Sequence, residues 1–318
     1  MNKLYNEHIK KEFLKLYEET SQHAIERVFN KSYSAEKLLR KDLYDFNENE
    51  IGIVLSELEP HSVDVAKSLG FYIKSYISWA MPYRKSNLNP LDIATDSYFE
   101  RFVDKSKKIH WAEDELIEQL EKLPNGQDKA LVMLIFNGIL GEEAIELIDL
   151  NYFDIDWSSN EIYIASRKEK LKVSDACIKY LKEAHRQQNY YSLSDDNKEF
   201  PLVETDYIFK NIYGKKSQDS KQVTSGVIYG RLSRIKDYLS LDYLTTNSIK
   251  QSGMIKYAVD LWSNRGKLGK EEFNLIGDRF NLNKIHANGY EYHNKTLMKK
   301  YINEENIKKL YGIDVQIS

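Results

Sequence analysis

Apolar residues recur every three or four positions through most of the chain, which is the spacing of amphipathic helices. In the first hundred residues this pattern predicts four helices: residues 4–28, a second starting at Ser34, a third from Asn47 to Pro60, and a fourth over 62–80. Ser34 and Asn47 are expected to cap their helices, and Pro60 and Pro82 to end the preceding ones. The pattern therefore predicts a small all-helical bundle.

The rest of the chain changes period once. Residues 161–165 alternate as in a strand, and Leu171 and Val173 predict a hairpin partner. Residues 187–197 are expected to form a loop. Helices are predicted over 112–122, 129–136, 142–148, 175–188, 223–239, 248–263, 270–280, 295–301 and 305–311. We expect a mainly α fold with a small β-sheet (α+β), divided within the polar segment 84–108 into domains 1–105 and 106–318.

Composition favours a globular protein of a reducing compartment. The 318 residues include 46 Lys+Arg and 49 Asp+Glu, a net charge of −3, and 42% are hydrophobic. A single cysteine, Cys177, excludes an internal disulfide and a multi-cysteine metal cluster. The charged N-terminus is unlike a signal peptide, and the apolar run 130–136 is too short to span a bilayer. We expect a cytoplasmic protein without membrane contact.

No common catalytic motif is present. The chain lacks a phosphate-binding loop, a nucleophile elbow and a His-Glu-x-x-His sequence. His286 and His293 are seven residues apart, but Asn288-Gly289 between them favours a turn over a metal-binding helix face. We predict no metal and no cofactor, and Cys177 is interpreted as a structural residue.

Local basic density is the stronger signal. Residues 208–250 hold eight basic and three acidic side chains, a local charge of +5. Arg231 and Arg234 are three apart, so both can project from one helix face, and Tyr229, Tyr238 and Tyr243 are interleaved. The pattern alone fits a nucleic-acid-binding surface and a solvated basic face equally well.

Several segments resemble the phage integrase (tyrosine recombinase) family in the family's order. Gly141-Glu142-Glu143-Ala144-Ile145-Glu146-Leu147 is followed by an Asp-Ile-Asp at 154–156 and by the predicted hairpin, where Lys168 or Lys170 falls near the family's lysine. Thr245-Thr246-Asn247-Ser248-Ile249-Lys250, Ile276-Gly277-Asp278 and Tyr301 resemble later motifs. The resemblance implies a helical core-binding domain followed by an integrase-like catalytic-type domain.

The departures from the family pattern concern the catalytic groups. The family's reaction is attack of a tyrosine on a DNA phosphate, assisted by arginines, histidines and a lysine. Here Glu143 stands at the first arginine position and Lys250 at the second, and the histidines are replaced by Asn247 and Asp278. A carboxylate repels phosphate, and lysine lacks the bidentate fork of arginine. We therefore expect no catalytic residue and no recombinase activity, even if Tyr301 occupies the nucleophile's place.

What the resemblance then implies is DNA binding without cleavage. The chain is similar to the lysogeny repressors of SP-beta-like temperate phages, which are built on an integrase fold. That similarity implies sequence-specific binding to double-stranded operator DNA and transcription repression in the bacterial cytoplasm, in association with the nucleoid. Expected contacts in the second domain are Arg231, Arg234, Tyr229, Lys236, Lys168, Lys170 and Lys250. In the first domain they are Lys67, Lys74, Arg84 and Lys85.

Two other functions remain as alternatives. The first is an active, divergent recombinase that uses Tyr301 and Lys250. The second is a protein-interaction module without DNA affinity. The C-terminal residues 303–318 carry alternating Ile313, Val315 and Ile317, which could dock in cis or on a second copy of the chain. An anti-repressor or signalling partner is a further open question.

Overall fold

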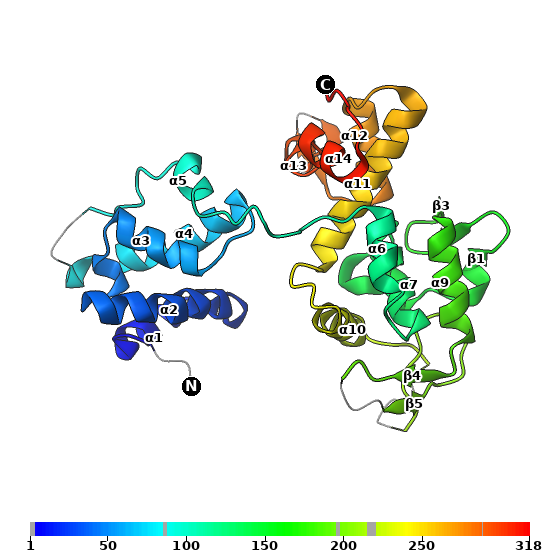
Figure 1. Ribbon diagram of the computed structural model, residues 1–318, viewed down its shortest axis with the longest axis horizontal. Helices are drawn as coiled ribbons and strands as arrows, with labels where there is room; N and C mark the ends of the chain where they lie inside the picture. Colours follow the sequence, from blue (N-terminus) through cyan, green and yellow to red (C-terminus); the bar gives the residue numbers. More distant parts are fainter. Residues whose placement is uncertain (1–3, 85–87, 195–197, 215–220, 288) are drawn as a thin grey trace. The chain divides into compact units, whose positions relative to one another are not determined.

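The computed structural model describes residues 4–84, 88–194, 198–214, 221–287 and 289–318. The chain forms two compact units, Met1–Lys108 (unit 1) and Ile109–Ser318 (unit 2) (Figure 1). Each has its own hydrophobic core, and each is described separately. In these described ranges no helix is both long and apolar enough to cross a membrane.

Unit 1 is a helical bundle. Its elements are α1 (Glu7–Leu14), α2 (Glu19–Leu39), η1 (Leu43–Asp45), α3 (Glu48–Glu57), α4 (Val63–Trp79), η2 (Met81–Tyr83) and α5 (Asp96–Glu100). Both α3 and α4 begin at a capping side chain: the predicted cap Asn47 accepts a hydrogen bond through Oδ1 from Glu50 N at 3.0 Å, and Ser62 Oγ accepts one from Val65 N at 3.3 Å. Tyr98 and Phe99 of α5 enter the core, so the polar segment 84–108 is partly packed against unit 1.

The predictions for residues 4–28 and Ser34 were wrong. The chain reverses between α1 and α2, and α2 continues through Ser34 to Leu39. The reason is a buried ion pair: Lys10 Nζ lies 2.6 Å from Glu36 Oε1. In one continuous helix these residues, 26 positions apart, would be about 39 Å apart along the axis. The pair can form only because the chain turns back on itself.

Unit 2 alternates helices with short strands. In chain order it contains α6 (Glu113–Leu120), α7 (Gly126–Phe136), η3 (Glu142–Ala144), α8 (Ile145–Ile148), η4 (Tyr152–Asp154), β1 (Ile155–Asp156), β2 (Glu161–Ile164), β3 (Glu169–Lys172), α9 (Asp175–Arg186), β4 (Asn189–Tyr191), β5 (Glu199–Pro201), α10 (Ser225–Tyr238), α11 (Thr246–Arg265), α12 (Lys270–Arg279), β6 (Lys284–Ala287), β7 (Tyr290–His293), α13 (Lys295–Lys299) and α14 (Glu304–Tyr311). All residues of α7 are buried, and α9, α10 and α11 pack against it.

The predicted hairpin is present as β2–β3, antiparallel, with Ile162 opposite Leu171, and β1 extends it to three strands. The loop expected over 187–197 was wrong at its start, because β4 pairs there with β5. The β6–β7 hairpin was not predicted. The strands β4 and β5 have three residues each, too short to show a clear alternation, and β7 is exposed at three of its four residues, so it has no buried face to alternate with.

The C-terminal tail docks in cis in this structure. Ile317 forms a parallel bridge with Leu268, and Ser318 N donates to Leu268 O at 3.1 Å. Val315 is buried in the same apolar cluster as Phe273 of α12. The alternating apolar residues of the tail are therefore already packed within their own chain.

Gly253 tests how closely α11 and α7 pack. A Cβ atom added there would lie 1.8 Å from the Phe136 carbonyl oxygen, a backbone atom that cannot move aside alone. We predict that Gly253→Ala lowers the free energy of unfolding by about 3 kcal/mol or more, measured by urea denaturation. Gly226→Ala is the matched control, because a Cβ there meets no atom closer than 3.7 Å. Equal stability of the two variants would contradict this packing.

Candidate nucleic-acid interface

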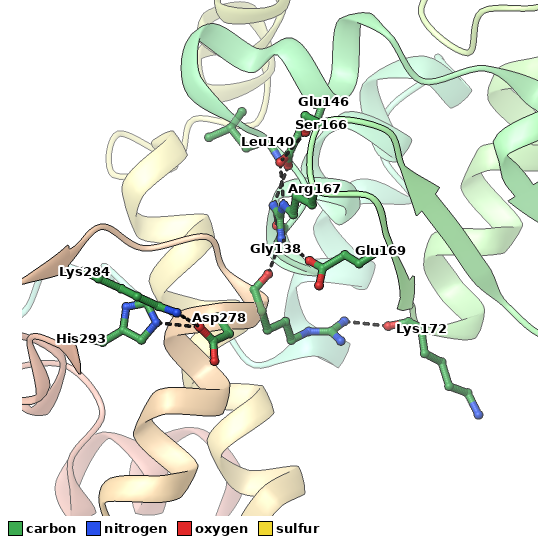
Figure 2. A network of polar contacts seen from close by, with 11 residues as sticks. Gly138, Leu140, Glu146, Ser166, Arg167, Glu169, Lys172, Asp278, Lys284 and His293 are labelled. Carbon is green, nitrogen blue, oxygen red and sulfur yellow. Dashed lines mark hydrogen bonds and ion pairs between the residues drawn. The ribbon is translucent and has the colours of Figure 1, made fainter. Parts of the chain in front are cut away.

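Arg167 is the centre of a polar network in unit 2 (Figure 2). It lies in the turn between β2 and β3, and its Nε and Nη2 both donate to the Glu146 carboxylate at 2.6 Å. Its Nη1 donates to the Arg279 carbonyl and its Nη2 to the Gly138 carbonyl, each at 2.7 Å. The guanidinium thus joins the hairpin to the end of α12 and to the segment after α7.

Both carboxylate oxygens of Glu146 accept hydrogen bonds inside the protein. Its side chain is 0% exposed, and it also accepts hydrogen bonds from Leu140 N at 2.8 Å and Ser166 Oγ at 3.3 Å. The backbone before it is kinked, with left-handed φ angles of 49° at Glu143 and 64° at Ala144. This kink turns Glu146 inward and leaves Glu143, which the resemblance aligns with the first catalytic arginine, exposed.

Lys250 lies beside this pair. Burial lowers the pKa of Lys250, the positive charge of Arg167 lowers it further, and Glu146 opposes the shift. Lys250 therefore shares a partly buried site with an arginine that is already bound to a carboxylate. Asn247, one turn earlier on α11, is exposed.

Asp278 belongs to a separate cluster next to Arg279. Its Oδ1 lies 3.0 Å from His293 Nε2 and 3.0 Å from Lys284 Nζ (Figure 2). These contacts lower the pKa of the Asp278 carboxyl against the opposing effect of burial. The four positions that the resemblance aligns with catalytic residues are Glu143, Asn247, Lys250 and Asp278, which carry two carboxylates, an amide and one lysine.

Tyr301, which the resemblance aligns with the nucleophile, is partly buried against α11. Its hydroxyl lies 3.1 Å from Met254 Sδ, and burial raises its pKa to about 12. A hydroxyl that is buried against a thioether, with a raised pKa, is a weak nucleophile at neutral pH.

The prediction that Arg231 contacts DNA was wrong, because its side chain is buried. It is 3% exposed and donates to Gln127 Oε1 and the Lys210 carbonyl, each at 2.7 Å, with its guanidinium 4.9 Å from the Tyr190 ring centre. The other α10 residues are accessible: Arg234 and Tyr229 are exposed, and Lys236 is half-buried beside Asp237 at 3.5 Å. The solvent face of α10 therefore carries Arg234, Tyr229 and Lys236.

The hairpin lysines are also accessible. Lys168 is exposed in the turn, where it adopts φ 54°, and makes no ion pair in the described part of the chain. Lys170 is exposed and lies 3.8 Å from Glu161. Both follow Arg167 in sequence and have exposed side chains, while the Arg167 side chain is buried. Sequence reasoning did not single out Arg167, whose only signal is a third cation in the predicted hairpin turn.

The candidates of unit 1 differ in accessibility. Lys67 and Lys74 are half-exposed and pair with Asp96 at 2.6 Å and Asp92 at 2.9 Å. Arg84 was a wrong prediction as a surface contact, because its side chain is 3% exposed and donates to the Leu88 carbonyl at 2.9 Å. Lys85 and the basic pair Lys215-Lys216 lie outside the described residues.

No cluster of His, Cys, Asp and Glu that could hold a metal ion occurs in the described ranges. His286 and His293 face separate partners, Glu291 and Asp278. Cys177 is buried on α9, and burial raises the pKa of its thiol well above the usual range. This environment makes the thiol unreactive and favours a structural role for Cys177.

Unit 1 is helical and unit 2 is mainly α with small sheets, which is the two-domain arrangement expected from the resemblance to tyrosine recombinases. Family models described as "MrpR, N-terminal core-binding domain" and "MrpR, C-terminal catalytic domain" match residues 4–82 and 110–312. The chain belongs to the MrpR family.

The chain is also similar to a prophage-derived protein and to several solved recombinase and integrase structures. The chain is 28% identical over 323 residues to the SPbeta prophage-derived uncharacterized protein YopR of Bacillus subtilis (strain 168), covering 97% of each. It is similar to XerA recombinase (12% identity, TM-score 0.41, 97% and 98% covered) and to a lambda integrase dimer bound to a COC' core site (12%, 0.42, 93% and 95%). A Tn1549 transposon integrase with circular intermediate DNA gives 11%, 0.45, 95% and 97%.

Removing Arg167 should destabilise unit 2. We predict that Arg167→Met lowers the free energy of unfolding by about 3–5 kcal/mol, because it leaves the Glu146 carboxylate buried without its counterion. Urea denaturation measures the loss. Adding Glu146→Gln should restore part of it, since the buried charge is then removed as well. Arg186→Met, at an exposed site on α9, is the control. A loss below about 1 kcal/mol for Arg167→Met would contradict the role of the network.

Proposed function

We propose that this protein binds double-stranded DNA sequence-specifically and represses transcription without cutting the DNA. The observation that carries the proposal is the internal use of Arg167: the one arginine at the centre of the catalytic-type domain is bound to Glu146 and two carbonyls. Phosphoryl transfer needs cations whose donors are free to meet the transition-state oxygens. Tyr301, buried against Met254, adds to the same argument.

The accessible cations supply the DNA-binding surface in this proposal. On α10, Arg234 and Lys236 project from a helix that also carries the exposed ring of Tyr229. On the hairpin, Lys168 and Lys170 lie at and beside a turn, a form that can follow a groove or the phosphate backbone. Lys250 and the unit 1 residues Lys67 and Lys74 are proposed as secondary phosphate contacts.

The proposed biological role is the maintenance of phage lysogeny in the bacterial cytoplasm, as in the lysogeny repressors of SP-beta-like phages. Its support is the MrpR family membership together with the prophage origin in the name of YopR. In this proposal, operator binding silences lytic genes, and an anti-repressor or a signal releases the protein. Operator layout and any self-association of the protein follow from experiment.

Arg234→Ala should weaken binding to a specific genomic fragment by about 1–3 kcal/mol if the side chain reads a base. The measurement is a gel-shift titration on fragments of the genome that encodes the chain. Arg186→Ala removes an equal charge from α9 and should leave the affinity within about twofold of the unchanged protein. Equal losses of DNA affinity for Arg234→Ala and Arg186→Ala would mean that α10 contributes no more to binding than α9 does.

No covalent protein–DNA adduct should form on a nicked fragment that the protein binds, and Tyr301→Phe should bind the fragment as the unchanged protein does. A denaturing gel detects the adduct. An adduct that disappears in Tyr301→Phe would establish the recombinase alternative. The protein-interaction alternative predicts no DNA binding, whereas a phosphate-binding surface makes the affinity fall steeply with salt concentration.

A further inference from the structure

A cavity of about 320 Å³ lies within unit 2, between the C-terminal end of α7, the β3–α9 connection and one face of α11. Its charged and aromatic lining is formed by Glu113, Lys172, Lys256, Tyr257, Asp260 and Arg279. The volume is at the lower end of the range for small-molecule sites, ~300–1,000 Å³. The cavity borders the Arg167 network through Arg279 and Lys172, and no residue of the proposed DNA-binding surface lines it.

The cations of this cavity are not equivalent. Lys256 Nζ lies 2.7 Å from Asp260 and 3.8 Å from Glu113, so two carboxylates neutralise it. The Arg279 guanidinium lies 4.8 Å from the centre of the Tyr257 ring and donates from Nη2 to the Lys172 carbonyl at 2.7 Å. Within the described ranges it forms no ion pair with a carboxylate. Asp260 attracts the guanidinium from beyond ion-pair distance, so Arg279 is a fixed cation without a direct carboxylate contact.

We propose that this cavity binds a small organic molecule that carries a carboxylate or phosphate group, with Arg279 as the anion-binding residue. A guanidinium presents a planar fork of donors that matches both groups, and here the Tyr257 ring and the Lys172 carbonyl hold the fork in place. Lys172 adds a second positive charge at the rim. Phe136 and Val173 also line the cavity and offer apolar surface to the body of the molecule.

The same arginine connects the cavity to the hairpin. The Arg279 carbonyl accepts a hydrogen bond from Arg167, and its side chain donates to the carbonyl of Lys172 on β3. A bound anion that attracts the Arg279 guanidinium alters its hydrogen bond to the Lys172 carbonyl. This bond is one of the two contacts that hold β2–β3 against α12. Since the hairpin carries Lys168 and Lys170, the bound anion alters DNA affinity. This coupling rests on the proposed function, whereas anion binding does not.

Binding is tested on the full-length protein by calorimetric titration with benzoate and with phenyl phosphate, at constant ionic strength, and with benzamide as the neutral analogue. We expect saturable 1:1 binding of at least one anion and none of benzamide, and the tighter anion identifies the preferred group. Arg279→Lys keeps the charge but loses the fork, so it should weaken binding about tenfold or more. Binding of neither anion, or equal binding of benzamide, would overturn the proposal.

Matched variants keep the test independent of folding defects. Lys172→Met should weaken anion binding about two- to fivefold, and Lys170→Met, two positions away on the same strand but outside the cavity, should leave it unchanged. Tyr257→Leu removes the ring that holds the guanidinium and should weaken binding while Arg279 remains. Unchanged binding in both Arg279→Lys and Tyr257→Leu, each folded by circular dichroism, would place the anion elsewhere.

Hydrogen exchange separates this inference from the proposed function. Saturating benzoate or phenyl phosphate should change the exchange of amides in residues 161–172, and DNA affinity should change with it. Altered hairpin exchange without any DNA binding would support the cavity and refute the proposed function. Anion binding that leaves hairpin exchange unchanged would refute the coupling.

Discussion

The buried ion pair between Glu146 and Arg167 is the interaction on which the arrangement of unit 2 depends. It holds three segments that are far apart in sequence: the turn after α7, the β2–β3 hairpin and the end of α12. Taking two charges out of water costs several kcal/mol per ion, and only near-complete hydrogen bonding offsets that cost. The bidentate contact, the two carbonyl acceptors of Arg167 and the two further donors to Glu146 meet this requirement.

In the proposed function, the same pair separates DNA binding from DNA cleavage in physical terms. Cleavage needs several cationic donors that converge on one phosphate, while binding needs cations spread along a surface. Around Arg167 the charges cancel, and Lys250 is partly buried next to them. The exposed cations of α10 and of the hairpin turn are instead spread over two elements. An active centre can thus be neutralised while the surface around it keeps its charge.

The sequence predicted elements whose signals are local. The Asn47 cap, the alternation over 161–165 and the long apolar periods of α4 and α11 all depend on neighbouring residues, and the structure contains them. What it could not predict depends on contacts between distant residues. Lys10 reaches Glu36 only because the chain reverses, and Arg167 reaches Glu146, Gly138 and Arg279 only in the folded unit. Glu146 turns inward because the backbone is left-handed at Glu143 and Ala144, and neither residue type predicts that conformation.

Arg231 and Arg234 show why charge counting overestimates a binding surface. Three residues on an α-helix correspond to a rotation of about 300°, so the two side chains point about 60° apart. The edge of the buried face of α10 falls between them: Arg231 is buried against Tyr190, whereas Arg234 is exposed. Lys210 is also buried, with its Nζ 2.6 Å from the His185 carbonyl. Two of the eight basic residues of 208–250 therefore stabilise the interior. Because these two residues make internal structural contacts, the basic surface of residues 208–250 is smaller than its sequence indicates, and the specificity of the proposed DNA complex depends on few, well-positioned side chains.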